Sequence, residues 1–131
     1  MKNRLFIILL FTLFGAGSAF ANTMGQHEIS NAIKQAKMGS KATTLQQVDM
    51  HLHRVLNCLE GRKGMEYDAK AGDPCMGKGA MNDFKSGKFG RDELQQAMED
   101  AHYGLMTKRV SIAQNAADLA IHSLSSAKAG D

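Results

Sequence analysis

Apolar side chains recur at helical spacing in four stretches of this chain. The clearest stretch is 44–60, where apolar positions follow one another at alternating intervals of three and four residues. This spacing is typical of a helix that packs on other helices along one stripe. No stretch alternates apolar and polar residues in the way of a half-buried strand. The pattern therefore predicts four helices, over residues 23–38, 44–60, 91–108 and 111–127.

Each predicted helix has a start signal. A hydroxyl or carboxyl side chain is followed three residues later by a glutamine, which is the spacing of a capping box. In such a box the two side chains satisfy free N–H groups of the first helical turn. We expect Gly39 with Ser40, and then Gly61, to end the first two helices. The four cap pairs are Thr23 with Gln26, Thr44 with Gln47, Asp92 with Gln95 and Ser111 with Gln114.

The lengths of the connections predict how the helices are arranged. The first and second helices, and the third and fourth, are joined by short links, which make antiparallel neighbours. The connection 61–90 is different, because it has 30 residues and seven glycines. A loop of that length in a small domain is functional, disordered or held in place. We therefore predict an all-α fold, an up-down four-helix bundle with this long loop between its second and third helices.

The first 21 residues have the pattern of a secretory signal peptide. Lys2 and Arg4 precede an apolar run over 5–14, and the small residues Ala19 and Ala21 flank Phe20 before the expected cleavage point. The apolar run is too short to span a bilayer by itself. The prediction is a signal peptide over 1–21, a single domain over 22–131, and a periplasmic or secreted protein with no membrane partner after cleavage.

Removal of the signal peptide changes the charge balance. The whole chain has 16 basic and 13 acidic residues, and the loss of Lys2 and Arg4 leaves 14 basic residues against the same 13 acidic ones. A domain so close to neutral has no electrostatic footprint for nucleic acid. We therefore expect no nucleic-acid partner.

Export also bears on the two cysteines. Cys58 lies at the end of the second predicted helix, and Cys75 follows 17 positions later. In an oxidising compartment such a pair is expected to form a disulfide, with free thiols or a metal pair as the alternatives. The bridge would hold the loop 61–90 in place and stabilise the fold by about 3 kcal/mol. We expect three loop aromatics to form a lid over one end of the bundle: Tyr67, Phe84 and Phe89.

No arrangement of residues typical of catalysis is present. The sequence has no Gly-x-Ser-x-Gly nucleophile elbow and no Cys-x-x-Cys pair, and its loop acids lack the spacing of a calcium loop. We predict no catalytic residues and a protein that is not an enzyme. A haem-binding bundle with Met24 and His122 as axial ligands is a further alternative.

A stripe of soft donors on the third predicted helix is the candidate metal site. Met98, His102 and Met106 follow at intervals of four residues and so share one helix face. Thioether and imidazole groups suit copper(I). His51 flanks the apolar stripe of its own helix and is the candidate fourth ligand. The alternative is that the two methionines fill the edge of the core and that His102 is a boundary residue.

Two segments of the chain resemble known proteins. The motif NCL at 57–59, followed by GDPC at 72–75, resembles small exported bacterial helical proteins that carry a similar disulfide loop and have no established activity. The segment 97–105 is similar to helical repeats of the small metal-binding proteins of the bacterial periplasm. That resemblance implies a four-helix fold that binds divalent metals, copper among them, through many histidines. This chain has five histidines, fewer than that pattern requires.

These observations lead to two functional hypotheses. The first is a small exported, non-enzymatic binding protein of the periplasm whose ligand is a metal such as copper. The second is an interaction module of the envelope, or a secreted one, that presents the loop between Cys58 and Cys75 to a protein partner. The metal content of the exported protein distinguishes them.

Overall fold

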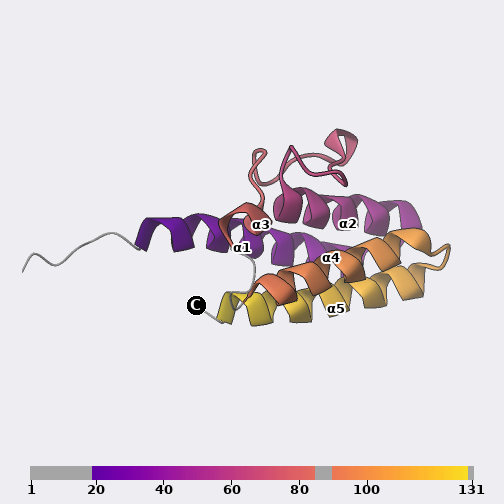
Figure 1. Cartoon of the computed structure of the whole chain (residues 1–131). Helices are drawn as coiled ribbons and strands as arrows, with labels where there is room; N and C mark the ends of the chain where they lie inside the picture. The colour runs from indigo at the N-terminus through magenta and orange to yellow at the C-terminus, as the bar shows by residue number, and fades with distance from the viewer. Residues whose placement is uncertain (1–18, 85–89, 130–131) are drawn as a thin grey trace, which may run out of the picture.

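The computed structural model describes residues 19–84 and 90–129, with side chains from residue 25 onward. Every regular element in these ranges is helical, so the predicted all-α class is confirmed (Figure 1). Among the described residues four helices are long and one is short, and a 3₁₀ turn, η1, lies between α2 and α3. The elements are α1 (Ala19–Lys41), α2 (Leu45–Glu60), η1 (Ala69–Ala71), α3 (Ala80–Asp83), α4 (Arg91–Met106) and α5 (Val110–Ala129).

The four long helices lie side by side and enclose the core (Figure 1). Helix α1 packs against α2 and α5, and α4 packs against the same two helices. Each helix contributes the apolar stripe that its sequence predicts, and α5 contributes mainly alanines, which allow close approach of its neighbours. The fully buried side chains of largest volume in the core include Ile29, Leu52, Leu56, Leu59, Leu94 and Leu124.

Helix α1 does not end where the sequence predicts. It continues through Gly39 to Lys41, because Gly39 is a packing residue and not a helix stop. A Cβ atom at this position would lie 3.3 Å from the Cβ of His51 and 3.6 Å from that of Ala117. Glycine therefore allows α1 to approach α2 and α5 closely, and its backbone flexibility is not used to end the helix.

Of the four predicted caps, that of Thr44 is confirmed. Its hydroxyl accepts a hydrogen bond from the backbone N–H of Gln47 at 3.3 Å. The other three predicted caps are wrong, because Thr23, Asp92 and Ser111 lie inside helices that begin earlier. At the start of α4 the carboxylate of Glu93 accepts from the backbone N–H of Gly90 at 3.0 Å. On α5 the amide of Gln114 instead donates to the carbonyl of Ala42, at 2.8 Å.

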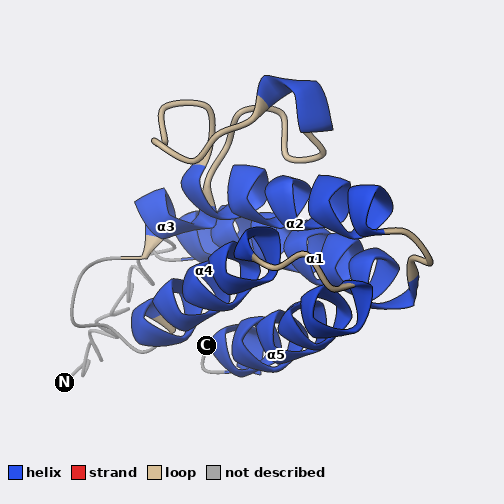
Figure 2. Cartoon of the chain, turned by 90° about the vertical axis from the view of Figure 1, so that its right-hand side faces the viewer, coloured by secondary structure: helices blue, strands red, loops and turns tan. Residues whose placement is uncertain are grey.

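The long connection between α2 and α4 folds back along α2. Figures 1 and 2 show the part that carries η1 lying over the outer side of this helix and then returning to α3. The predicted lid over one end of the molecule is therefore replaced by a loop along its flank. Phe84 packs against the core, and Tyr67 donates its hydroxyl to Asp73 at 3.0 Å. Phe89 lies outside the described residues.

No helix in the described ranges is both long enough and apolar enough to cross a membrane. Most of the predicted signal peptide, residues 1–18, lies outside the described residues, and α1 begins at Ala19.

Candidate metal-binding groove

A groove runs along the outer face of α4 and has a volume of about 410 Å³. Leu56 and Glu60 on α2 line it together with the adjoining loop residues Met65 and Glu66. Six residues at helical spacing on α4 form its floor: Gln95, Met98, Glu99, His102, Tyr103 and Met106.

The three donors predicted on α4 all line this groove. Met98 is half-buried against the core, while His102 and Met106 are exposed, the latter by 69%. The stripe therefore starts at a helix boundary, as expected, and becomes open to solvent toward the end of α4. Because the three side chains face one groove, a soft metal ion could contact more than one of them.

The loop adds two residues that sequence reasoning did not assign to the site. Met65 lines the groove with a side chain that is 99% exposed. The carboxylate of Glu66 lies 3.3 Å from Nδ1 of His102. A carboxylate at this nitrogen fixes the imidazole ring and leaves Nε2 available to a ligand. Neither residue has a spacing signal in the sequence, because their position depends on the path of the loop.

Several hydrogen bonds hold this part of the loop in place. The carboxylate of Glu60 accepts from the backbone N–H of Glu66 at 2.8 Å. The buried amide of Asn57 donates to the carbonyls of Asp68 and Gly72, and its oxygen accepts from the backbone N–H of Asp68, each at 2.8 Å. The groove thus has a loop edge that is attached to α2 on both sides of η1.

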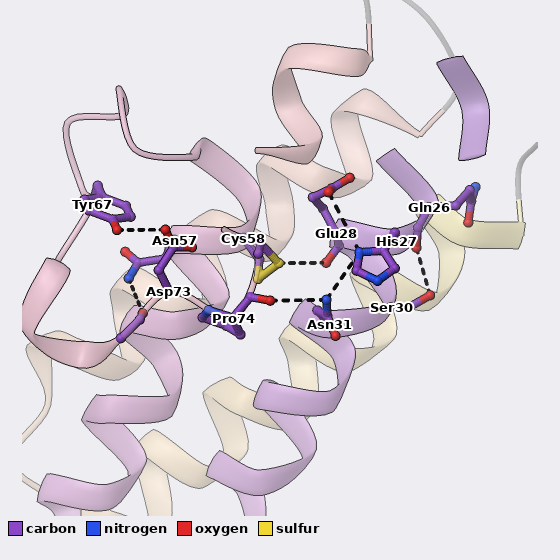
Figure 3. The surroundings of a disulfide bond; sticks show 12 residues. Gln26, His27, Glu28, Ser30, Asn31, Asn57, Cys58, Tyr67, Asp73 and Pro74 are labelled. Atoms are coloured by element: carbon purple, nitrogen blue, oxygen red, sulfur yellow. Dashed lines mark hydrogen bonds and ion pairs between the residues drawn. A yellow bond between two sulfur atoms is a disulfide. The ribbon is translucent and has the colours of Figure 1, made fainter. Parts of the chain in front are cut away.

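The disulfide predicted between Cys58 and Cys75 is present, with 5.2 Å between the two Cα atoms. Both residues are buried in the core. Figure 3 shows that the return limb of the loop also reaches α1, where the amide of Asn31 donates to the carbonyl of Pro74 at 3.4 Å. The bridge therefore joins α2 to a segment that itself contacts α1.

A second carboxylate organises the middle of the loop. Asp73 is partly buried, which by itself would raise its pKa. Hydrogen bonds from the backbone N–H of Gly77, the hydroxyl of Tyr67, the guanidinium of Arg62 and the backbone N–H of Cys75 outweigh this effect and lower the pKa of Asp73. The carboxylate therefore stays ionised, and it connects Arg62 and Tyr67 in the first part of the loop to the returning segment that contains Asp73.

His51 does not join the other three candidate ligands. It is only 7% exposed, and its Nδ1 lies 2.9 Å from the side-chain oxygen of Gln35 on α1. Burial, and then the positive charge of Arg54, lower the pKa of His51. It lies beside Lys37 and Lys41 in a different depression of the surface. The loop residue Met65, and not His51, lines the groove with the three residues of α4.

His53 and His122 also lie outside the groove. Burial raises the pKa of Asp49, and one oxygen of this residue and Nδ1 of His53 are buried without hydrogen-bond partners. His122 is exposed on α5. Within residues 19–84 and 90–129, no three His, Cys, Asp or Glu side chains gather as they would around a metal ion.

No protein-family model matches this chain, and no match was found among curated proteins or solved structures.

Proposed function

We propose that this is an exported, non-enzymatic protein that binds copper(I) in the groove along α4. The observation that supports this most strongly is the convergence of four soft donors on one surface. Met98, His102 and Met106 come from α4, and Met65 comes from the loop that follows α2. Thioether and imidazole ligands favour copper(I) over the hard cations, which prefer oxygen.

Glu66 has a supporting role in this proposal. Its carboxylate beside Nδ1 of His102 orients the ring and keeps Nε2 for the metal. Residues of this kind that support a metal ligand typically change metal affinity by about 10- to 100-fold when they are replaced. We expect Glu66→Gln to weaken copper(I) binding by about tenfold.

The proposal predicts one equivalent of copper(I) per chain. The titration uses anaerobic protein with ascorbate, which keeps copper reduced and leaves the disulfide intact, in competition with a chelator of moderate affinity. We expect His102→Ala combined with Met106→Leu to abolish binding, because two of the four donors are lost. The matched control is His122→Ala combined with Met38→Leu, which removes an exposed histidine and an exposed methionine outside the groove.

Two outcomes contradict this proposal. One is a parent protein that takes no copper(I) from the chelator, and the other is a groove variant that binds as well as the parent. Either result would favour the interaction module that presents the loop between Cys58 and Cys75. A feature directly after Cys75 supports that second function. Met76 is 71% exposed and adopts the left-handed conformation, with φ of 54°, which is uncommon for a side chain of its size.

The proposed setting is the periplasm or the cell exterior, and the proposed topology is an up-down four-helix bundle. The disulfide supports an oxidising compartment, and the pairwise packing of the four long helices supports the bundle. The proposal includes cleavage after Ala21. We expect the intact mass of the exported protein to correspond to a chain that begins at Asn22, and a mass that includes Lys2 would contradict cleavage.

A further inference from the structure

Helix α4 presents a buried apolar stripe to the core and a second stripe of methionine and histidine to the groove. The buried stripe consists of Leu94, Ala97, Ala101 and Gly104. The second stripe, along Met98, His102 and Met106, faces the groove. A helix with a second stripe at intervals of four residues has a surface that a further helix could pack against.

The groove is larger than a metal ion requires. Its volume of about 410 Å³ lies in the range of pockets that take organic ligands. Its floor extends from Gln95 to Met106, which corresponds to three turns of helix or about 16 Å. An elongated apolar groove of this length suits a helical peptide segment.

Exposed apolar side chains are concentrated here. Among the described residues, six large hydrophobic side chains are markedly exposed, and three of them line this groove: Met65, Tyr103 and Met106. Methionine is flexible and polarisable, so that a methionine-lined surface can adapt to different apolar partners. Tyr103 adds a rigid aromatic surface of the kind that anchors peptide interfaces.

The charges of the groove all have one sign. Glu60, Glu66 and Glu99 line it, and the described residues that line it include no lysine or arginine. The carboxylate of Glu99 accepts only a long contact of 3.5 Å from Gln95 and is otherwise available to an incoming cation. Such a field favours partners that carry Lys or Arg and repels acidic ones.

We propose that this groove is a docking site for a cationic amphipathic helix of a protein partner. The partner helix would carry apolar anchors at positions i, i+3 or i+4, and i+7, with Lys or Arg on its flanks. This inference goes beyond copper binding, because docking uses the apolar surface and the carboxylates and does not require a metal.

The test uses a defined probe. A synthetic Leu/Lys amphipathic peptide of about four helical turns is titrated into the exported protein without copper and followed by fluorescence anisotropy. A Leu/Glu peptide of the same pattern is the charge control. We expect the Leu/Lys peptide to bind, the Leu/Glu peptide not to bind, and high salt to weaken the Leu/Lys complex.

Groove variants and matched controls locate the binding. Tyr103→Ala and Glu99→Lys should each weaken the Leu/Lys peptide by about tenfold, which is a change of about 1.4 kcal/mol. Leu119→Ala and Asp118→Lys alter exposed side chains of similar kind on α5 and should leave binding unchanged. Equal binding of both peptides, no binding of the Leu/Lys peptide, or insensitivity to the groove variants would each overturn the proposal.

The same variants separate docking from copper binding. Met98→Leu with Met106→Leu removes two thioethers but keeps apolar volume, so it should abolish copper(I) binding and keep peptide binding. Tyr103→Ala should weaken peptide binding and leave copper(I) binding unchanged. If each of these variants lost both copper(I) binding and peptide binding, the groove would have been disrupted as a whole. That result would contradict docking that is independent of the metal.

Discussion

Replacing Asn57 with alanine should destabilise the protein by about 3 kcal/mol. Asn57 is fully buried on α2, and its side chain makes three hydrogen bonds of 2.8 Å to the backbone of the loop. Alanine leaves two carbonyls and one N–H of the loop without protein partners. Each such group costs about 1–3 kcal/mol when it stays buried, and less where water reaches it.

Urea unfolding of the oxidised protein, followed by circular dichroism, measures this effect. Asn82→Ala is the matched control, because Asn82 is exposed and donates one long hydrogen bond of 3.4 Å to the carbonyl of Glu60. It should change the free energy of unfolding by less than about 1 kcal/mol. If the two asparagine variants are equally stable, the buried amide does not hold the loop as described.

The second large effect concerns the disulfide. Replacement of Cys58 and Cys75 together by alanine should lower the free energy of unfolding by about 3 kcal/mol, because the bridge restricts the unfolded chain across 17 positions. In a domain of this size that corresponds to a fall in Tm of about 15 °C. The helical content at low temperature should remain close to that of the parent, since the helix contacts in the core are otherwise kept.

A labelling experiment serves as the control for this prediction. Both sulfurs are buried and bonded, so the native protein should show no free thiol, and denatured, reduced protein should show two. Labelling of both cysteines in the native, non-reduced protein would contradict the bridge. An alanine variant as stable as the parent would show instead that the hydrogen bonds of Asn57 hold the loop without help from sulfur.

Much of the helical core could be predicted because its signal is local. The intervals of three and four residues along α2 specify which side of the helix is buried, and Val48, Leu52 and Val55 are buried accordingly. The disulfide could be predicted because the chain contains two cysteines. The end of α1 could not be predicted from the sequence. Gly39 can either stop a helix or let two helices approach, and which of these it does depends on neighbours that are distant in the sequence.

The same reason limited what the sequence predicts about the groove. Spacing on one helix placed Met98, His102 and Met106 together, and they do line one surface. The prediction for His51 required knowledge of how α2 is rotated about its axis, and the helix turns this side chain toward Gln35. Met65 and Glu66 depend on a glycine-rich loop whose path is set by Asn57 and Asp73, contacts that have no periodic signature.

The disulfide also has a consequence for proteolysis. Together with the backbone between them, Cys58 and Cys75 close a covalent ring, and the exposed Lys63 and Lys70 lie within it. A protease that cuts the ring after either lysine leaves the two parts of the chain joined through sulfur. After a cut at Lys63, the hydrogen bonds between Asn57 and Asp68 still attach the following segment of the loop to α2. A single break in the loop therefore yields a nicked molecule whose four long helices remain covalently connected, and separating the two pieces would require reduction together with unfolding.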